Sequence, residues 1–104
     1  MKDLFSLKLL ISLMMRVRLR IYGRVQGVFF RATAREQAKR LGLTGYVKNE
    51  PDGSVTIEAQ GPEEKINQFV IWCHNGPPLA EVVRVDIEKN LEPIKEEKNF
   101  EIRY

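Results

Sequence analysis

Apolar and polar side chains alternate along residues 16–22 (RVRLRIY), which predicts a β-strand with one buried face and one solvated face. From residue 30 onward the apolar positions repeat at helical spacing. They predict a helix over residues 31–41 that ends at Gly42, a residue type that readily forms the left-handed turn after a helix. A second helix is predicted to begin with Pro62 at its first position and to stop at Gly76.

The remaining alternating segments predict more strands, separated by the turn Pro51-Asp52-Gly53 and by a charged loop. These predicted strands are 44–49, 55–59, 83–87 and 100–104. The resulting order is βαββαβ with a short extra C-terminal strand. This is the split βαβ, or ferredoxin-like, arrangement: an α+β sandwich in which two helices cover one face of an antiparallel sheet. The pattern therefore predicts one domain over residues 16–104.

Residues 1–15 (MKDLFSLKLLISLMM) form an apolar N-terminal extension outside this pattern. Their length resembles the apolar region of an export signal, but Lys2 and Asp3 cancel in charge and no small-residue cleavage site follows. We expect that the extension either packs as an extra helix or results from a start codon upstream of Met15. Its role stays open.

Charge is distributed unevenly along the chain, although the formal net charge is only +3. Residues 16–48 carry nine basic side chains and one acidic one, whereas residues 49–104 carry six basic and twelve acidic ones. This asymmetry predicts that the first half meets an anion. We expect the arginines of the first strand, Arg16, Arg18 and Arg20, to be a solvated surface that at most attracts this anion.

The composition excludes several classes of site. A single cysteine and a single histidine, Cys73 and His74, cannot form an internal disulfide or a zinc site with the usual four ligands. Nothing around His74 suggests the base of a catalytic triad, and no apolar run reaches the ~20 residues of a membrane span. We therefore expect a cytoplasmic protein with no metal, no other cofactor and no membrane partner.

The loop between the first strand and the first helix is the most informative segment. Gly23 and Gly27 allow the backbone to curl closely around a ligand, and the free N–H groups of a helix N-terminus attract an anion. Arg31 stands where the helix begins, and its guanidinium could hold two oxygens of one phosphate. No Gly-Lys-Ser/Thr follows, so this is not a nucleotide-triphosphate loop. A tight turn followed by a solvated arginine is the alternative that these residues leave open.

Asn49 ends the predicted second strand. In a split βαβ fold this strand runs back toward the N-terminus of the first helix, so Asn49 is expected at the same edge as the loop and Arg31. Taken alone, an asparagine before a turn is more typical of a residue that caps the hairpin than of a catalytic one.

Together the two segments resemble the acylphosphatase family. Residues 21–31 (IYGRVQGVFFR) are similar to its first signature, hydrophobic-x-Gly-x-Val-Gln-Gly-Val-x-Phe-Arg. Residues 45–61 are similar to its second, an aromatic residue and an asparagine followed by spaced glycines and valine. The resemblance covers about residues 16–104.

The resemblance implies hydrolysis of an acyl phosphate to a carboxylate and inorganic phosphate without a metal or another cofactor. By this similarity Arg31 and the amides of a phosphate-binding loop hold the phosphoryl group, and Asn49 positions the attacking water. The residues of that loop are Arg24, Val25, Gln26, Gly27, Val28, Phe29 and Phe30. The partners expected are a small acyl phosphate and inorganic phosphate, with no nucleic acid, and the protein is expected to be a monomer.

The alternative function is a non-catalytic module of the same fold that binds phosphate or RNA. Sheets of this topology bind RNA by stacking bases on strand aromatics. Here the first strand offers Tyr22 and little else that is aromatic, and both Arg31 and Asn49 are present. These observations favour the enzyme.

Overall fold

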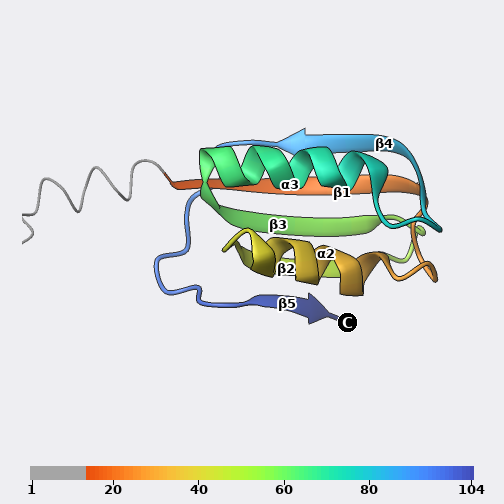
Figure 1. The fold of residues 1–104 in the computed structure, drawn as a ribbon, viewed down its shortest axis with the longest axis horizontal. Coiled ribbons are helices and arrows are strands. Elements are labelled where there is room, and N and C mark those ends of the chain that lie inside the picture. Colours follow the sequence, from red (N-terminus) through yellow and green to blue (C-terminus); the bar gives the residue numbers. More distant parts are fainter. Residues whose placement is uncertain (1–13) are drawn as a thin grey trace, which may run out of the picture.

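The predicted order of strands and helices is confirmed by the computed structural model, which describes residues 14–104 (Figure 1). Two helices lie side by side on one face of a single sheet. The elements are β1 (Met14–Arg24), α2 (Phe30–Arg40), β2 (Thr44–Asn49), β3 (Val55–Pro62), α3 (Glu63–Asn75), β4 (Glu81–Glu88) and β5 (Phe100–Arg103).

The sheet has the strand order β4-β1-β3-β2-β5. The four strands of the split βαβ unit pair antiparallel, as predicted, whereas β5 pairs parallel to β2. The sheet is therefore mixed. The register places Ile102 of β5 beside Val47 of β2, so the chain's last residues run toward the edge at which β2 ends.

The core lies between the sheet and the helices. Val17, Leu19 and Ile21 of β1 are buried on the face predicted by their alternation. They share one core cluster with Phe69 and Ile66 of α3, which packs on β1, while α2 packs on β2 and β5. Because every core strand has one face on these helices, alternation also decides which of its side chains point to the helical side.

The boundaries of the elements differ slightly from the predicted ones. Strand β1 begins at Met14, which pairs with Pro62, so two residues of the apolar extension belong to the sheet. The expectations about the rest of the extension fall on residues 1–13, outside the described part of the chain. Pro62 is the residue before α3 rather than its first helical residue, because its ψ of 141° is extended.

The predicted helix ends are confirmed. Gly42, with φ of +72°, follows α2, and the N–H groups of Gly42 and Leu43 donate to the carbonyls of Lys39 and Ala38. This is the Schellman arrangement, which satisfies carbonyls that the last helical turn leaves free. Gly76, with φ of +67°, ends α3.

Candidate active site

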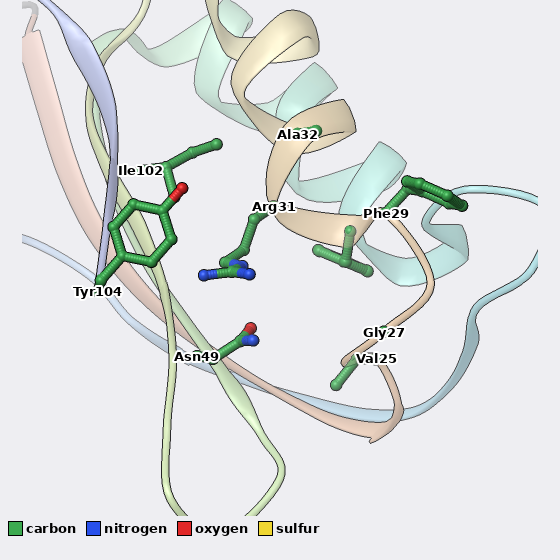
Figure 2. A pocket seen from close by; sticks show the side chains of 9 residues that line it. Val25, Gly27, Phe29, Arg31, Ala32, Asn49, Ile102 and Tyr104 are labelled. Atoms are coloured by element: carbon green, nitrogen blue, oxygen red, sulfur yellow. The ribbon is translucent and has the colours of Figure 1, made fainter.

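An open cavity of about 310 Å³ lies where the β1–α2 loop, the end of β2 and the end of the chain meet (Figure 2). Its lining includes predicted site residues from both signature segments. These are Val25, Gly27, Phe29, Phe30, Arg31 and Asn49. Sequence reasoning missed Ala32, Ile102 and Tyr104, which also line it. The structure therefore brings the two segments together at one edge of the sheet.

Apolar side chains anchor the loop beside this cavity. Val25, Val28 and Phe30 are buried in the core, with exposed fractions of 1%, 4% and 1%. Between these anchors Gly27 has φ of +74° and Phe29 has φ of +68°. A left-handed conformation costs about 1–2 kcal/mol for a residue other than glycine, so the strain at Phe29 marks a segment whose curled shape is imposed by its anchors.

The loop leads into the N-terminus of α2, which carries an unbalanced positive end. None of the side chains in residues 14–104 caps the helix by a hydrogen bond at Phe29, and its first turn contains no acidic residue. Helix α3 differs, because Glu63 and Glu64 occupy its first turn. Free N–H groups and the helix dipole therefore favour an anion at α2.

Arg31 stands in the first turn of α2, and its guanidinium lies in the space between Asn49 and Tyr104 (Figure 2). The ring of Tyr104 lies 5.0 Å from the guanidinium carbon, a cation–π contact. Within residues 14–104 Arg31 takes part in no ion pair with a carboxylate. Its charge is thus available to a ligand in the cavity.

Asn49 is the last residue of β2 and shares the face of Val47, so its side chain points to the helical side of the sheet. Its Oδ1 atom is buried and has no hydrogen-bond partner among the described residues. Buried polar atoms are nearly always hydrogen-bonded, so an orphaned acceptor that faces Arg31 across a cavity is suited to binding a ligand or water (Figure 2).

Three residues of the predicted loop lie next to the cavity without lining it. Arg24 is the exposed end of β1, paired in register with Glu81 of β4. Val28 is a core residue. Gln26 is half-buried, and its side chain donates hydrogen bonds to the backbone of the β2–β3 hairpin.

The expectation that the arginines of the first strand are solvated is wrong for Arg16. This side chain is only 2% exposed and bonds Glu58, Gln60 and Glu97. The acidic partners lie 40 or more residues away in sequence, so the alternation of β1 alone could not reveal them.

The other two arginines of this strand are partly exposed, and each is also paired. Arg18 bridges Glu58 and Glu88, and Arg20 pairs with Asp52. The three arginines of β1 are therefore neutralised on the open face of the sheet, whereas the other basic side chains of residues 16–48 form no ion pair within the described residues.

Other groups with potential chemistry lie outside the cavity. Cys73 is fully buried, and this burial raises the pKa of its thiol, which keeps it from acting as a nucleophile. Across residues 14–104 no group of three or more His, Cys, Asp or Glu side chains is arranged to hold a metal ion. The helices in this part of the chain are all too short or too polar to cross a bilayer.

A family model described as acylphosphatase matches residues 17–102, which include the whole cavity lining except Tyr104. The chain belongs to the acylphosphatase family. This confirms the family resemblance of the two signature segments and the prediction of an acylphosphatase enzyme.

Proteins named acylphosphatase match this chain over most of their own length. The acylphosphatase of Rubrobacter xylanophilus is 47% identical over 89 residues, which are 85% of this chain and 79% of that protein. The acylphosphatase of Aeropyrum pernix is 48% identical over 93 residues, which are 88% of this chain and 90% of that protein.

Solved acylphosphatase structures share the fold. The Bacillus subtilis acylphosphatase superposes with a TM-score of 0.82 at 36% identity, covering 86% of this chain and 99% of that one. A full-length HypF in its phosphate- and nucleotide-bound form superposes with a TM-score of 0.75 at 26% identity, covering 88% of this chain but 12% of that one. The acylphosphatase fold thus also occurs as a small part of a larger protein.

Proposed function

We propose that this acylphosphatase hydrolyses the carboxyl–phosphate bond of small acyl phosphates by direct attack of water, without a metal ion. The phosphoryl group is held by Arg31 and by backbone amides of residues 24–30, and Asn49 positions the water. The observation that carries the proposal is the buried, unpartnered Oδ1 of Asn49 facing Arg31 across the cavity.

Phosphate binding follows from the electrostatics of the loop and helix. The phosphoryl oxygens carry negative charge, and the N-terminus of α2 offers free N–H groups beside a cation that has no acidic partner within residues 14–104. A transition state of phosphoryl transfer spreads charge over the equatorial oxygens, so amides and Arg31 that are already in place stabilise it without rearranging.

Attack by water needs a group that orients it without repelling the phosphate. The amide of Asn49 is neutral, and its free Oδ1 can accept a hydrogen bond from the water. The water oxygen forms a bond to phosphorus while the bond from phosphorus to the acyl oxygen breaks. The electron pair of the broken bond leaves with the carboxylate, and the proton released by the water passes to solvent.

The leaving group explains why so few residues suffice. A carboxylate is the conjugate base of an acid with a pKa of about 4, so it leaves at neutral pH without a proton from a general acid. The remaining requirement is that water and phosphoryl group be held in line, which is a matter of positioning. A chain that supplies an arginine, an asparagine and loop amides is sufficient for this reaction.

The alternative of a binding module without catalysis draws on the likeness to part of HypF. An RNA-binding sheet would need free cations on the open face, but Arg18 and Arg20 there are paired with acidic groups. Arg31 and Asn49, in contrast, face one small cavity. These contacts support hydrolysis over RNA binding.

Hydrolysis of acetyl phosphate in the presence of EDTA tests the proposal. Arg31→Ala and Asn49→Ala should each lower turnover by about 100-fold or more while the circular dichroism spectrum stays unchanged. Arg40→Ala, at the exposed C-terminal end of α2, is the matched control and should keep wild-type turnover. Full activity of Asn49→Ala would overturn the water-positioning role, and loss of wild-type activity with EDTA would overturn metal independence.

We further propose that the protein acts in the cytoplasm as a monomer. One chain supplies every residue that lines the cavity, so the site needs no second copy. Size-exclusion chromatography with light scattering should give a mass close to 12.1 kDa, and a multiple of it would contradict the monomer.

A further inference from the structure

The side chain of Gln26 joins the phosphate-binding loop to the β2–β3 hairpin. Its Nε2 atom donates to the carbonyl oxygen of Glu50 at 2.8 Å and to that of Ser54 at 2.9 Å. The Ser54 carbonyl also accepts the N–H of Glu50 at 2.8 Å, which closes the hairpin. One amide group therefore contacts both sides of the turn that follows Asn49.

This junction lies beyond the point at which the pairing between β1 and β3 ends. The ladder between β1 and β3 stops at the pair Ile21 and Val55, and beyond it β1 continues only beside β4. The loop of residues 25–29 belongs to no strand, so the sheet does not hold it at a set distance from the hairpin. Gln26 spans this gap at the position next to the cavity.

We propose that Gln26 is a positioning residue for hydrolysis, which sets the loop amides that hold the phosphoryl group at the correct distance from Asn49. The inference rests on the proposed function, because it assumes that the loop holds phosphate and that Asn49 holds water. Gln26 itself does not line the cavity and touches neither group.

A neutral primary amide of this length suits the contact. Both acceptors are carbonyl oxygens, so the bridging group must donate two N–H bonds from one atom, as the Gln26 Nε2 does. Asparagine is one methylene shorter, methionine donates nothing, and an ionised glutamate would face two carbonyl oxygens with another negative charge.

The first test is Gln26→Met, which keeps the length of the side chain and removes the donor. We expect kcat for acetyl phosphate to fall by about 10- to 100-fold, because the water and the phosphoryl group lose their alignment. The inhibition constant of inorganic phosphate should change by less than about 3-fold, because the loop amides and Arg31 remain. Gln68→Met, on the exposed surface of α3, is the control and should match wild type in both.

The second test is Gln26→Glu measured as a function of pH. An ionised carboxylate cannot donate, whereas the protonated acid donates one O–H to a carbonyl and restores part of the bridge. The ratio of its kcat to that of wild type should therefore rise by about 3-fold or more between pH ~7.5 and pH ~5. A residue that merely fills space would give a flat ratio. This variant also serves if Gln26→Met fails to fold.

The outcomes separate the two proposals. A kcat of Gln26→Met within about 2-fold of wild type, a rise in the phosphate inhibition constant as large as the fall in kcat, or a flat pH ratio for Gln26→Glu would each overturn the positioning role. These results leave the proposed function standing if Asn49→Ala is inactive. If Asn49→Ala is fully active, the proposed function fails instead, whatever Gln26 does.

Discussion

The buried guanidinium of Arg16 allows a stability prediction with a matched control on the same strand. Arg16→Met removes a charge that bonds Glu58 at 3.0 Å and Glu97 at 2.8 Å, where the exposed fractions of the three side chains are only 2%, 10% and 12%. Breaking a buried pair by removing one partner costs about 3–5 kcal/mol, because the other charge stays desolvated. In Arg16→Met this applies to Glu97, whereas Glu58 keeps its bonds to Arg18 and Tyr46. We expect a loss of that size in the free energy of unfolding.

Arg18→Met is the control, since Arg18 also bonds Glu58 but is 45% exposed. An exposed ion pair contributes about 0–1 kcal/mol, so this variant should unfold nearly like wild type. Arg16→Lys keeps the charge and loses the forked geometry, and it should fall between the two.

Urea unfolding followed by the fluorescence of Trp72 measures these differences. Trp72 is the single tryptophan of the chain and packs against Phe30 and Phe69, so its emission reports the core. Equal stabilities of Arg16→Met and Arg18→Met would refute the reasoning that burial decides the contribution of this pair.

Activity provides a further check on Arg16. Arg16 lies eight residues before Arg24, the end of β1 that leads into the loop at the cavity, and eight residues of extended chain span about 26 Å. The folded Arg16→Met protein should therefore hydrolyse acetyl phosphate at the wild-type rate. A large fall in kcat would show that the Arg16 network acts on the cavity.

Burial disfavours the charged form of Glu58, but hydrogen bonds from Tyr46, Arg18 and Arg16 outweigh it and hold the pKa of this carboxyl below its usual range. Its contribution to stability is thus present above the unfolded-state pKa of about 4.3 and is lost as pH falls through the folded-state pKa. Urea unfolding between pH ~5 and pH ~2 should show a smaller fall in the free energy of unfolding for Glu58→Gln than for wild type. An equal fall in both proteins would contradict the assignment. Gly27→Ala places a methyl group where, apart from its chain neighbours, no atom of residues 14–104 lies within 4 Å, so it should cost about 1 kcal/mol of stability and raise the inhibition constant of phosphate. Gly42→Ala, with a similar φ and equally open surroundings at the other end of α2, should cost the same stability and leave phosphate inhibition unchanged; equal inhibition in both variants would argue against close approach of phosphate to Gly27. Tyr104→Ala removes an exposed cation–π contact with Arg31 worth about 0.5–1 kcal/mol, so KM for acetyl phosphate should rise about 2- to 5-fold, whereas Tyr104→Phe should keep the wild-type value. A KM for Tyr104→Ala equal to that of wild type would show that this contact does not assist binding.

Local patterns in the sequence were sufficient for the order of the elements and for bringing Arg31 and Asn49 to one edge of the sheet. Alternation predicted the buried face of β1, and the presence of Gly42 and Gly76 predicted the ends of the two helices, where both glycines have positive φ. These signals depend on neighbouring residues alone. The split βαβ order then placed Asn49 at the same edge as Arg31, and the structure has both lining one cavity.

Contacts between residues far apart in the chain were decided only by the tertiary structure. The parallel pairing of β5 with β2 brings Tyr104 to Arg31 across more than 70 residues of sequence, and nothing local to either segment encodes that pairing. Arg16 looked like a surface residue because alternation reports which face a side chain occupies, not what covers that face. Glu97 and the backbone around Ile94, in the connection between β4 and β5, bury it there together with Gln60. Three of the nine basic side chains of residues 16–48, the arginines of β1, are therefore held in ion pairs. Arg31 has no acidic partner within the described residues because the fold places it beside a cavity rather than a carboxylate.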